Sequence, residues 1–468
     1  MSSKRLGMVT GSVALAALLL QACSGGSGGS GGGADTGESA GGGNAVSGKG
    51  GEPVTITLLN AQSDGIREKF FGETAIPEFE KENPGIKVEI INTPFEEFDS
   101  KMSTLVAGGT PPDVWSHWGH SGFVDYMTRH LTLDLTPYMN DFNNPNISES
   151  TMKVYNVDGK QYGIPLSIFP SLVFYNKDLL DKAGVKIPNY KYGDPEWTWD
   201  KLIGYAKQVS KDYGKPSAVY GFTWNMGSHM ATYSWDWGLD IFQDGYKTGF
   251  LDKADLTDPK FESAVKWYQD LILKDKITPT TAISDSLTKT GDPMLTGKVA
   301  FDLDGGWQLA GFKDQQFNFG VLPMPLGPAG TSTPFTYIDP LMISSKSKHP
   351  DAAWKFVKFM TSPDMQLKWA TMTGYPPADS KAYQEWLKQF GSQVDLTYLT
   401  QVIQDSIAHG KESPNHLIAG YADITSLMKN EQQQIFTNGA DPAKVLPEIN
   451  EKFNKLLQQI KEKAGAGT

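Results

Sequence analysis

Short strand-like and helix-like segments alternate from residue 54 onward, and this alternation restricts the fold more than any other feature of the sequence. Val54-Thr-Ile-Thr-Leu alternates apolar and polar residues, which is the period of a half-buried strand. The following helix should end at Pro84-Gly85, and the next one at Gly108-Gly109, a common C-terminal cap. The predicted segments are a strand at 54–58, a helix at 68–83, a strand at 86–91, a helix at 95–107 and a strand at 113–115. Because such alternation produces βαβ units, the sequence predicts an α/β fold with a parallel sheet.

Helix start signals recur later in the chain. A polar N-cap residue or a proline in the first turn begins each predicted helix, and apolar residues at helical spacing mark its core-facing side. The predicted starts are Thr198, Asp258-Pro259, Pro350, Ser362-Pro363 and Asp441-Pro442. About four hundred residues follow Glu52, which is long for one core and favours two lobes.

Charge and composition exclude several classes of protein. The formal net charge of −11 argues against binding to nucleic acid or docking on an anionic membrane surface. The region after Glu52 has only the arginines Arg67 and Arg129, which disfavours phosphates and multi-carboxylates as ligands. The 12 Trp and 18 Tyr residues are numerous, and many lie in polar, glycine-containing segments where core packing is not the obvious explanation.

The N-terminus has the pattern of a secreted lipoprotein. Lys4-Arg5 precedes an uncharged, mostly apolar run over residues 6–20, which is the order of a signal peptide and too short for an ordinary membrane span. Cys23, the one cysteine of the chain, follows Leu-Gln-Ala, and this resembles the bacterial lipobox. We therefore expect a signal peptide over 1–22, acylation of Cys23 and a lipid anchor in the membrane. The alternative is a plain signal peptide without acylation.

Residues 23–51 should form a flexible tether behind the lipidated cysteine. Gly and Ser dominate this stretch, and it has too few apolar residues to offset the chain entropy lost on folding. Acylation of Cys23 would leave no thiol for a disulfide, a thiolate metal site or a nucleophile. The predicted location is the extracellular or periplasmic face of the cell membrane.

Five segments together resemble the extracellular solute-binding proteins of carbohydrate ABC importers, the family that includes maltose-binding protein. They occur in the family's order and at family-like spacing from residue 54 to the C-terminus. The segments are residues 77–88, 105–115, 162–180, 297–307 and 349–360. The resemblance implies two α/β lobes that close like a clamp around a ligand, joined by a hinge of three crossing segments.

The same resemblance implies that each lobe is built from discontinuous sequence. The N-terminal lobe would comprise 52–167 and 336–376, and the C-terminal lobe 168–335 and 377–468. The crossing segments would lie near 165–170, 335–339 and 376–378. Such an arrangement permits rigid-body closure about a few backbone torsions.

A sugar site needs two kinds of side chain. Buried hydroxyls require donors and acceptors, because each unpaired one costs roughly 1–3 kcal/mol. The C–H faces of a sugar ring pack on the negative face of an aromatic ring. Tryptophan or tyrosine rimmed by polar side chains is therefore the pattern to look for.

His117, Trp118 and His120 have this character and follow the predicted strand at 113–115. Open α/β sheets bind ligands at the carboxyl ends of their strands, and the resemblance places both histidines at ligand-contacting positions. The alternative is a surface turn or a packed N-cap. Metal ligation is less favoured, since no carboxylate lies at matching spacing.

The other predicted ligand residues lie in segments where the resemblance implies a cleft. It places a sugar-stacking tryptophan at Trp307, with Asp304 nearby as a hydroxyl acceptor, and further stacking aromatics in the second lobe. The full set is Gln62, Ser63, Asp64, Phe169, Trp224, Trp235, Trp237, Asp304, Trp307 and Tyr375. Core packing is the alternative for the tryptophans. Phe169 replaces an acidic contact of maltose-binding protein, which puts maltose itself in doubt.

The resemblance implies a monomer without cofactor, metal or catalytic residues, which captures a carbohydrate and delivers it to ABC permease subunits. Three alternatives remain: a binder of another solute, a surface adhesin and a secreted glycoside hydrolase. A hydrolase needs two carboxylates flanking the bond it cleaves. Asp302/Asp304 and Asp236/Asp240 are the pairs to test.

Overall fold

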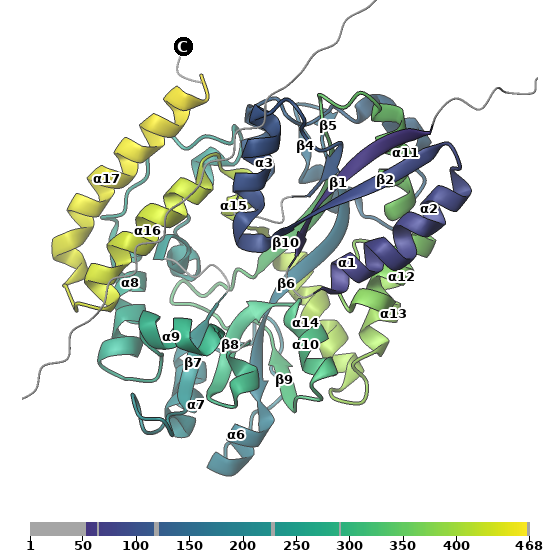
Figure 1. Cartoon of the computed structure of the whole chain (residues 1–468). Helices are drawn as coiled ribbons and strands as arrows, with labels where there is room; N and C mark the ends of the chain where they lie inside the picture. The colour runs from purple at the N-terminus through teal and green to yellow at the C-terminus, as the bar shows by residue number, and fades with distance from the viewer. Residues whose placement is uncertain (1–52, 63–64, 117–120, 226–229, 290–291, 466–468) are drawn as a thin grey trace, which may run out of the picture. The chain divides into compact units, whose positions relative to one another are not determined.

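The computed structural model describes residues 53–62, 65–116, 121–225, 230–289 and 292–465 (Figure 1). The strands are β1 (Val54–Gln62), β2 (Ile86–Pro94), β3 (Val114–Trp115), β4 (Asn156–Val157), β5 (Lys160–Gln161), β6 (Ile164–Asn176), β7 (Tyr220–Trp224), β8 (Val299–Gly305), β9 (Phe319–Leu322), β10 (Phe335–Ile343) and β11 (Lys411–Glu412). Six residues with a predicted role lie outside the described ranges: Cys23, Ser63, Asp64, His117, Trp118 and His120.

Helices lie on both sides of these strands (Figure 1). The α-helices are α1 (Ile66–Phe70), α2 (Ile76–Glu82), α3 (Phe98–Ala107), α4 (Phe123–Thr128), α5 (Glu149–Lys153), α6 (Lys177–Ala183), α7 (Trp199–Val209), α8 (Pro259–Leu273), α9 (Thr281–Thr288), α10 (Gln308–Asp314), α11 (Pro350–Met360), α12 (Pro363–Thr373), α13 (Ser380–Lys388), α14 (Leu396–His409), α15 (Pro414–Leu417), α16 (Tyr421–Phe436) and α17 (Pro442–Lys463). The π-helical turn is η1 (Phe71–Ala75), and the 3-10 turns are η2 (Phe95–Glu97), η3 (Thr136–Asp141), η4 (Met230–Trp237), η5 (Gln243–Gly245) and η6 (Met294–Thr296).

Nine of the described strands form one long sheet with two halves, and β4 and β5 form a separate two-stranded sheet. The order of the long sheet is β2-β1-β3-β10-β6-β8-β7, with β11 beside β10 and β9 beside β6. In the first half, β1 pairs in parallel with β2 and with β3, as the βαβ pattern predicted. In the second half, β7 pairs in parallel with β8, while β6 runs antiparallel to β8 and β9.

β6 and β10 connect the two halves of the sheet. They pair antiparallel, with Tyr337 opposite Phe169 and Thr336 opposite Pro170. A third segment lies against them, because Pro377 forms a bridge with Ser167 and the Ala378 N–H donates to the Leu166 carbonyl at 2.9 Å. The three segments that the sequence analysis assigned to the hinge therefore lie side by side.

Four of the predicted helix starts are confirmed by a hydrogen bond from the first helical turn to the capping side chain. The side chains of Thr198, Asp258, Ser362 and Asp441 each accept a hydrogen bond from a backbone N–H in the first helical turn. The helix predicted at 68–83 is instead interrupted, since the π-helical turn η1 separates α1 from α2. No helix within the described ranges is long and apolar enough to cross a bilayer.

Candidate functional site

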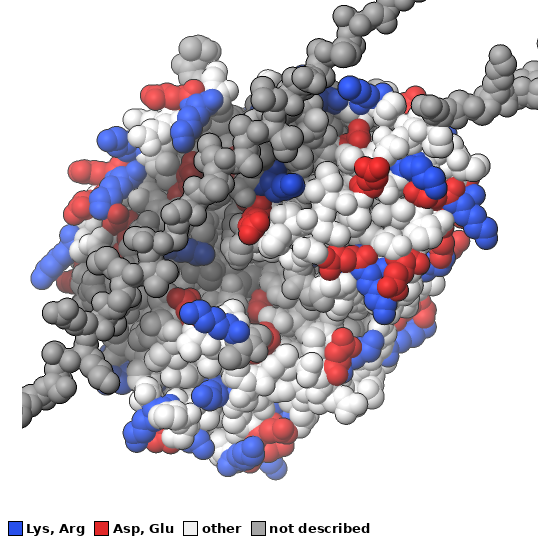
Figure 2. Space-filling view, viewed as in Figure 1, with Lys and Arg blue, Asp and Glu red and all other residues white. Residues whose placement is uncertain are grey.

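A cavity of about 1120 Å³ lies at the ends of β7 and β8. Helices α8, α9 and α16 contribute most of its remaining wall, and Phe95 comes from the first half of the chain. The described lining residues are Phe95, Thr223, Trp224, Asn225, Tyr233, Tyr268, Ile272, Thr278, Pro279, Thr281, Ser284, Asp285, Thr288, Asp292, Pro293, Asp304, Trp307, Gln308, Lys429, Asn430, Gln432, Gln433 and Phe436. Figure 2 shows that the surface is hollowed near the centre of the view.

Trp307 forms an aromatic wall of this cavity where the two halves meet. Its ring packs against Phe169 at 5.6 Å and Tyr337 at 5.5 Å between centroids, so residues of β6 and β10 hold it in place. Gly305 is required here, because an added Cβ would lie 2.3 Å from the Trp307 indole. The indole is only half-buried and keeps area for a ligand.

Trp224 lies on β7 and contacts the cavity from a more buried position. One face stacks on Trp199, with centroids 5.2 Å apart and planes 13° apart. Tyr233 packs beside it at 5.0 Å, and Tyr268 packs on Tyr233 at 4.5 Å. Since Trp224 is 4% exposed, it offers the cavity little surface.

Three carboxyl groups gather on the β8 side of the cavity. Asp292, Asp302 and Asp304 each have a carboxylate oxygen within 4.8 Å of the others. Burial raises the pKa of Asp292 to about 6 and that of Asp304 to about 7. Burial, followed by the charge of Asp304, raises the pKa of Asp302 well above its usual range.

Neighbouring donors hold two of these carboxyl groups in fixed orientations. Asp302 accepts hydrogen bonds from the Thr223 hydroxyl and the Asn225 amide, both at 2.7 Å. Asp304 accepts from the Gly305 N–H at 2.7 Å and from the Gln308 amide at 2.6 Å. Asp304 lines the cavity, whereas Asp302 lies behind it.

Trp235 and Trp237 lie in the 3-10 turn η4 and pack away from the described cavity wall. Trp235 stacks on Phe335 of β10, with centroids 4.4 Å apart, and the Lys411 ammonium lies 5.2 Å from its ring centre. Trp237 packs edge-on against Trp267 at 5.2 Å. A role for either residue in ligand binding stays a prediction.

Phe169 and Tyr375 belong to a buried aromatic group beside the crossing segments. Their ring centroids lie 6.0 Å apart, and Tyr375 also packs on Trp369 at 5.9 Å. Phe169 therefore acts on the cavity through Trp307, which it supports from behind. Gln62 is exposed at the end of β1 and donates a hydrogen bond to Glu68.

The second carboxylate pair considered for hydrolysis has structural partners. Asp236 accepts from the Trp199 indole N–H at 2.9 Å and from the Thr333 N–H at 2.9 Å, and burial raises its pKa to about 7. Asp240 pairs with the Lys411 ammonium and accepts from the Tyr246 hydroxyl at 2.9 Å. These contacts tie η4 and the segment after it to α7 and β11, and the residues lie outside the described cavity wall.

Sequence reasoning missed several cavity residues. Tyr233, Tyr268 and Phe436 were treated as core or not singled out, and Asp292 was not noticed at all. The usable signal was in α16, where a polar run that includes Gln432 and Gln433 interrupts the apolar face of a helix. Polar residues on a packed helix face often border a cavity, because buried polar groups need partners.

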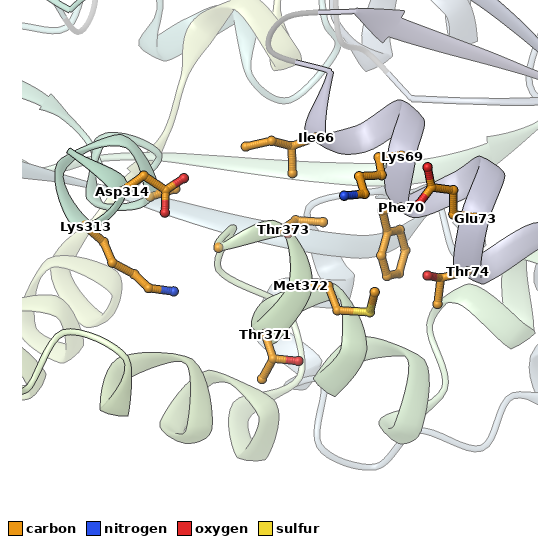
Figure 3. Close-up of a pocket in the computed structure, with 12 residues that line it drawn as sticks. Ile66, Lys69, Phe70, Glu73, Thr74, Lys313, Asp314, Thr371, Met372 and Thr373 are labelled. Atoms are coloured by element: carbon orange, nitrogen blue, oxygen red, sulfur yellow. The ribbon is translucent and has the colours of Figure 1, made fainter. Parts of the chain in front are cut away.

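A smaller cavity of about 360 Å³ lies between α1, α10 and the end of α12 (Figure 3). Lys69 and Glu73 come from the α1–η1 segment, and Lys313 and Asp314 from α10. The aromatic side chain in its wall is Phe70, which is itself buried. Without tryptophan faces and with mixed charge, this cavity suits a sugar less well than the larger one.

Comparison with known proteins agrees with the fold described above. The family model of the bacterial extracellular solute-binding proteins matches residues 63–367. A putative binding protein of Brucella abortus is 26% identical over 389 residues, which cover 81% of this chain and 88% of the relative. The maltodextrin-binding protein MdxE of Bacillus subtilis is 23% identical over 422 residues, covering 90% of this chain and 93% of that protein.

A solved structure shows the same architecture. The ABC substrate-binding protein Lmo0181 of Listeria monocytogenes, in complex with cycloalternan, superposes with a TM-score of 0.72 at 24% identity. The match covers 87% of this chain and 100% of that one. The predicted two-lobed α/β clamp is thereby confirmed. Since the family model spans more than half of the 468 residues, this chain belongs to the bacterial extracellular solute-binding protein family.

Proposed function

We propose that this protein is the substrate-binding component of an ABC importer. It captures a sugar or oligosaccharide in the large cavity and delivers this ligand to the permease. The observation that carries the proposal is the half-buried Trp307, whose indole faces a cavity of about 1120 Å³. The names of relatives support it, since one is a maltodextrin-binding protein and a structural neighbour holds cycloalternan.

The lining of the cavity fits the chemistry of a hydroxyl-rich ligand. Trp307 offers a face for the C–H side of a sugar ring. Asp304, Asn225 and Gln433 offer polar groups for hydroxyls, which must be paired when they leave water. The cavity is large enough for more than one sugar unit by the usual range of ligand pockets, so we favour an oligosaccharide.

Capture requires the two lobes to approach each other. We propose the lobe boundaries given above, 52–167 with 336–376 and 168–335 with 377–468. The division of the sheet at β6 and β10 supports them. A ligand that contacts Trp307 on one side and residues of the first lobe on the other would favour the closed state over open ones.

We propose binding without catalysis. Family members and neighbours are binding proteins. The best carboxylate pair, Asp302 and Asp304, is constrained, because Asp302 lies behind the wall and both of its oxygens already accept hydrogen bonds. Incubation with candidate oligosaccharides should yield no cleavage products by chromatography, whereas product formation would establish a glycoside hydrolase.

Carbohydrates that bind should raise the thermal stability of the protein. A ligand that binds only the folded state adds RT ln(1 + [L]/Kd), which is about 2.7 kcal/mol at a hundredfold excess over Kd. A melting-temperature screen against mono- and oligosaccharides, with amino acids, short peptides and polyol phosphates as controls, measures this effect. Stabilisation by a control class alone would overturn the carbohydrate proposal.

We further propose that an acylated Cys23 anchors the protein as a monomer on the outer face of the cell membrane. The Cys23→Ala variant should appear in the soluble fraction or the medium, because loss of two or more acyl chains removes the stable anchor. Cell fractionation with immunoblotting measures the distribution, and Ser24→Ala serves as the matched control. Retention of Cys23→Ala in the membrane fraction would show that the anchor lies elsewhere.

A further inference from the structure

The charged residues that line the large cavity are mostly acidic. Asp285, Asp292 and Asp304 contribute carboxyl groups, and Lys429 contributes the ammonium group among the described lining residues. A neutral sugar needs no such excess of one sign. An acidic wall beside aromatic rings is the environment that favours a cationic group, through charge-assisted hydrogen bonds and cation–π contact.

A residue of the cavity wall also carries a buried acceptor that no described residue donates to. The Gln432 side chain is 8% exposed, and its carbonyl oxygen Oε1 has no hydrogen-bond partner among the described residues. An unpaired buried acceptor costs about 1–3 kcal/mol, so a ligand that brings N–H or O–H donors recovers this energy. Gln432 projects from α16, which faces the carboxyl groups of β8 across the same cavity.

The cluster of Asp292, Asp302 and Asp304 is electrostatically unfavourable when its carboxyl groups ionise together. Asp292, Asp302 and Asp304 lie within 4.8 Å of one another, and like charges at this separation hinder simultaneous ionisation. Burial raises the pKa of Asp292 to about 6, and burial followed by the charge of Asp292 raises the pKa of Asp304 to about 7. A positive group placed beside them would favour their ionised forms and displace bound protons.

We propose that the carbohydrate ligand carries a protonated amino group, which binds between the Trp307 indole and the carboxylates of Asp292 and Asp304. This inference rests on the proposed function, because it assigns a substrate class to the same cavity. The ammonium group donates to the carboxylates, and the sugar ring stacks on the indole.

Paired ligands that differ in one group provide the test. Glucosamine oligosaccharides of two and three units, joined β-1,4, carry an ammonium group where cellobiose and cellotriose carry a hydroxyl. Calorimetry at mildly acidic pH should show at least about tenfold tighter binding of the amino sugars, since a charge-assisted hydrogen bond contributes about 1.5–3 kcal/mol. Titrations in two buffers of different ionisation enthalpy should reveal proton release with the amino sugars only.

Two variants locate the effect. Asp304→Asn should reduce the ratio of the amino-sugar affinity to the neutral-sugar affinity to near one. Asp270→Asn removes a carboxylate of α8 that pairs with Lys266 outside the described cavity wall, and it should leave the ratio unchanged. Both variants exchange one carboxyl group for an amide of the same shape, so a difference between them locates the effect at Asp304.

The outcomes separate this inference from the proposed function. Equal or tighter binding of cellobiose, cellotriose or the maltose series would overturn the amino-sugar inference and leave carbohydrate capture intact. Binding of Ca²⁺ or Mg²⁺ alone, abolished by Asp304→Asn and without any carbohydrate response, would overturn both. Failure of every carbohydrate in the panel would likewise count against both proposals.

Discussion

Replacement of Trp307 by alanine is expected to weaken carbohydrate binding by about 2–4 kcal/mol, which is the effect of truncating a central aromatic anchor. This corresponds to a loss of about thirty-fold to nine-hundred-fold in affinity. The reason is geometric, because Phe169 and Tyr337 support the indole from behind and leave its other area to the cavity. Isothermal titration calorimetry with the tightest ligand from the melting screen measures the change.

The Trp307→Phe variant is the matched control for that experiment. Phenylalanine keeps an aromatic face at the same position, so it should retain more of the affinity than alanine does. Both variants should melt within a few degrees of the parent protein, which circular dichroism can verify. Unchanged affinity in a folded Trp307→Ala protein would show that the ligand binds elsewhere.

Replacement of Glu412 by alanine should lower the free energy of unfolding by about 1–3 kcal/mol, the typical cost of leaving a buried donor without its hydrogen-bond acceptor. Glu412 lies on β11 beside the second crossing segment. It accepts hydrogen bonds from the Ile338 N–H at 3.2 Å and the Thr336 hydroxyl at 3.3 Å, and it contacts the His416 ring nitrogen Nδ1. Alanine would remove the shared acceptor of the Ile338 N–H and the Thr336 hydroxyl, and the partner of His416 Nδ1.

Burial determines the protonation of this pair. It raises the pKa of Glu412 well above its usual range and lowers the pKa of His416 to about 3. A neutral amide should therefore replace the carboxyl group at little cost, and Glu412→Gln is the control. Urea unfolding followed by tryptophan fluorescence yields both free energies. Equal destabilisation by alanine and glutamine would mean that the carboxyl group itself, and not the hydrogen-bond network, stabilises this region.

The elements that the sequence predicted correctly are those decided by local chemistry. Thr198, Asp258 and Asp441 cap their helices because a short polar side chain can reach the free N–H groups of the first turn in almost any context. The alternation of β1 with the helix after it likewise follows from spacing along the chain. The positions of the crossing segments came from family resemblance, since their pairing joins residues far apart in sequence.

The candidate site was predictable only in part, because tertiary packing decides which aromatic side chain faces the cavity. Trp307 and Trp235 look alike in sequence, each lying near glycine and aspartate. The structure packs Trp235 face to face with Phe335, whereas Gly305 leaves room for the Trp307 indole at the cavity wall. Asp292 escaped notice since its closeness to Asp302 depends on how the loop before β8 folds back.

The continuous sheet also limits how the molecule can be divided. β6 contributes Ile164 to the pairing with β10 at one end and Asn176 to the pairing with β9 at the other, so a single strand joins the two halves of the sheet. Under the proposed lobe boundaries, a gene fragment that encodes one lobe alone would cut this strand and expose unpaired backbone groups along the new sheet edge, which promotes aggregation. Truncation within β6 is therefore not expected to yield a single folded lobe. Inserted modules belong in surface loops away from the shared strands.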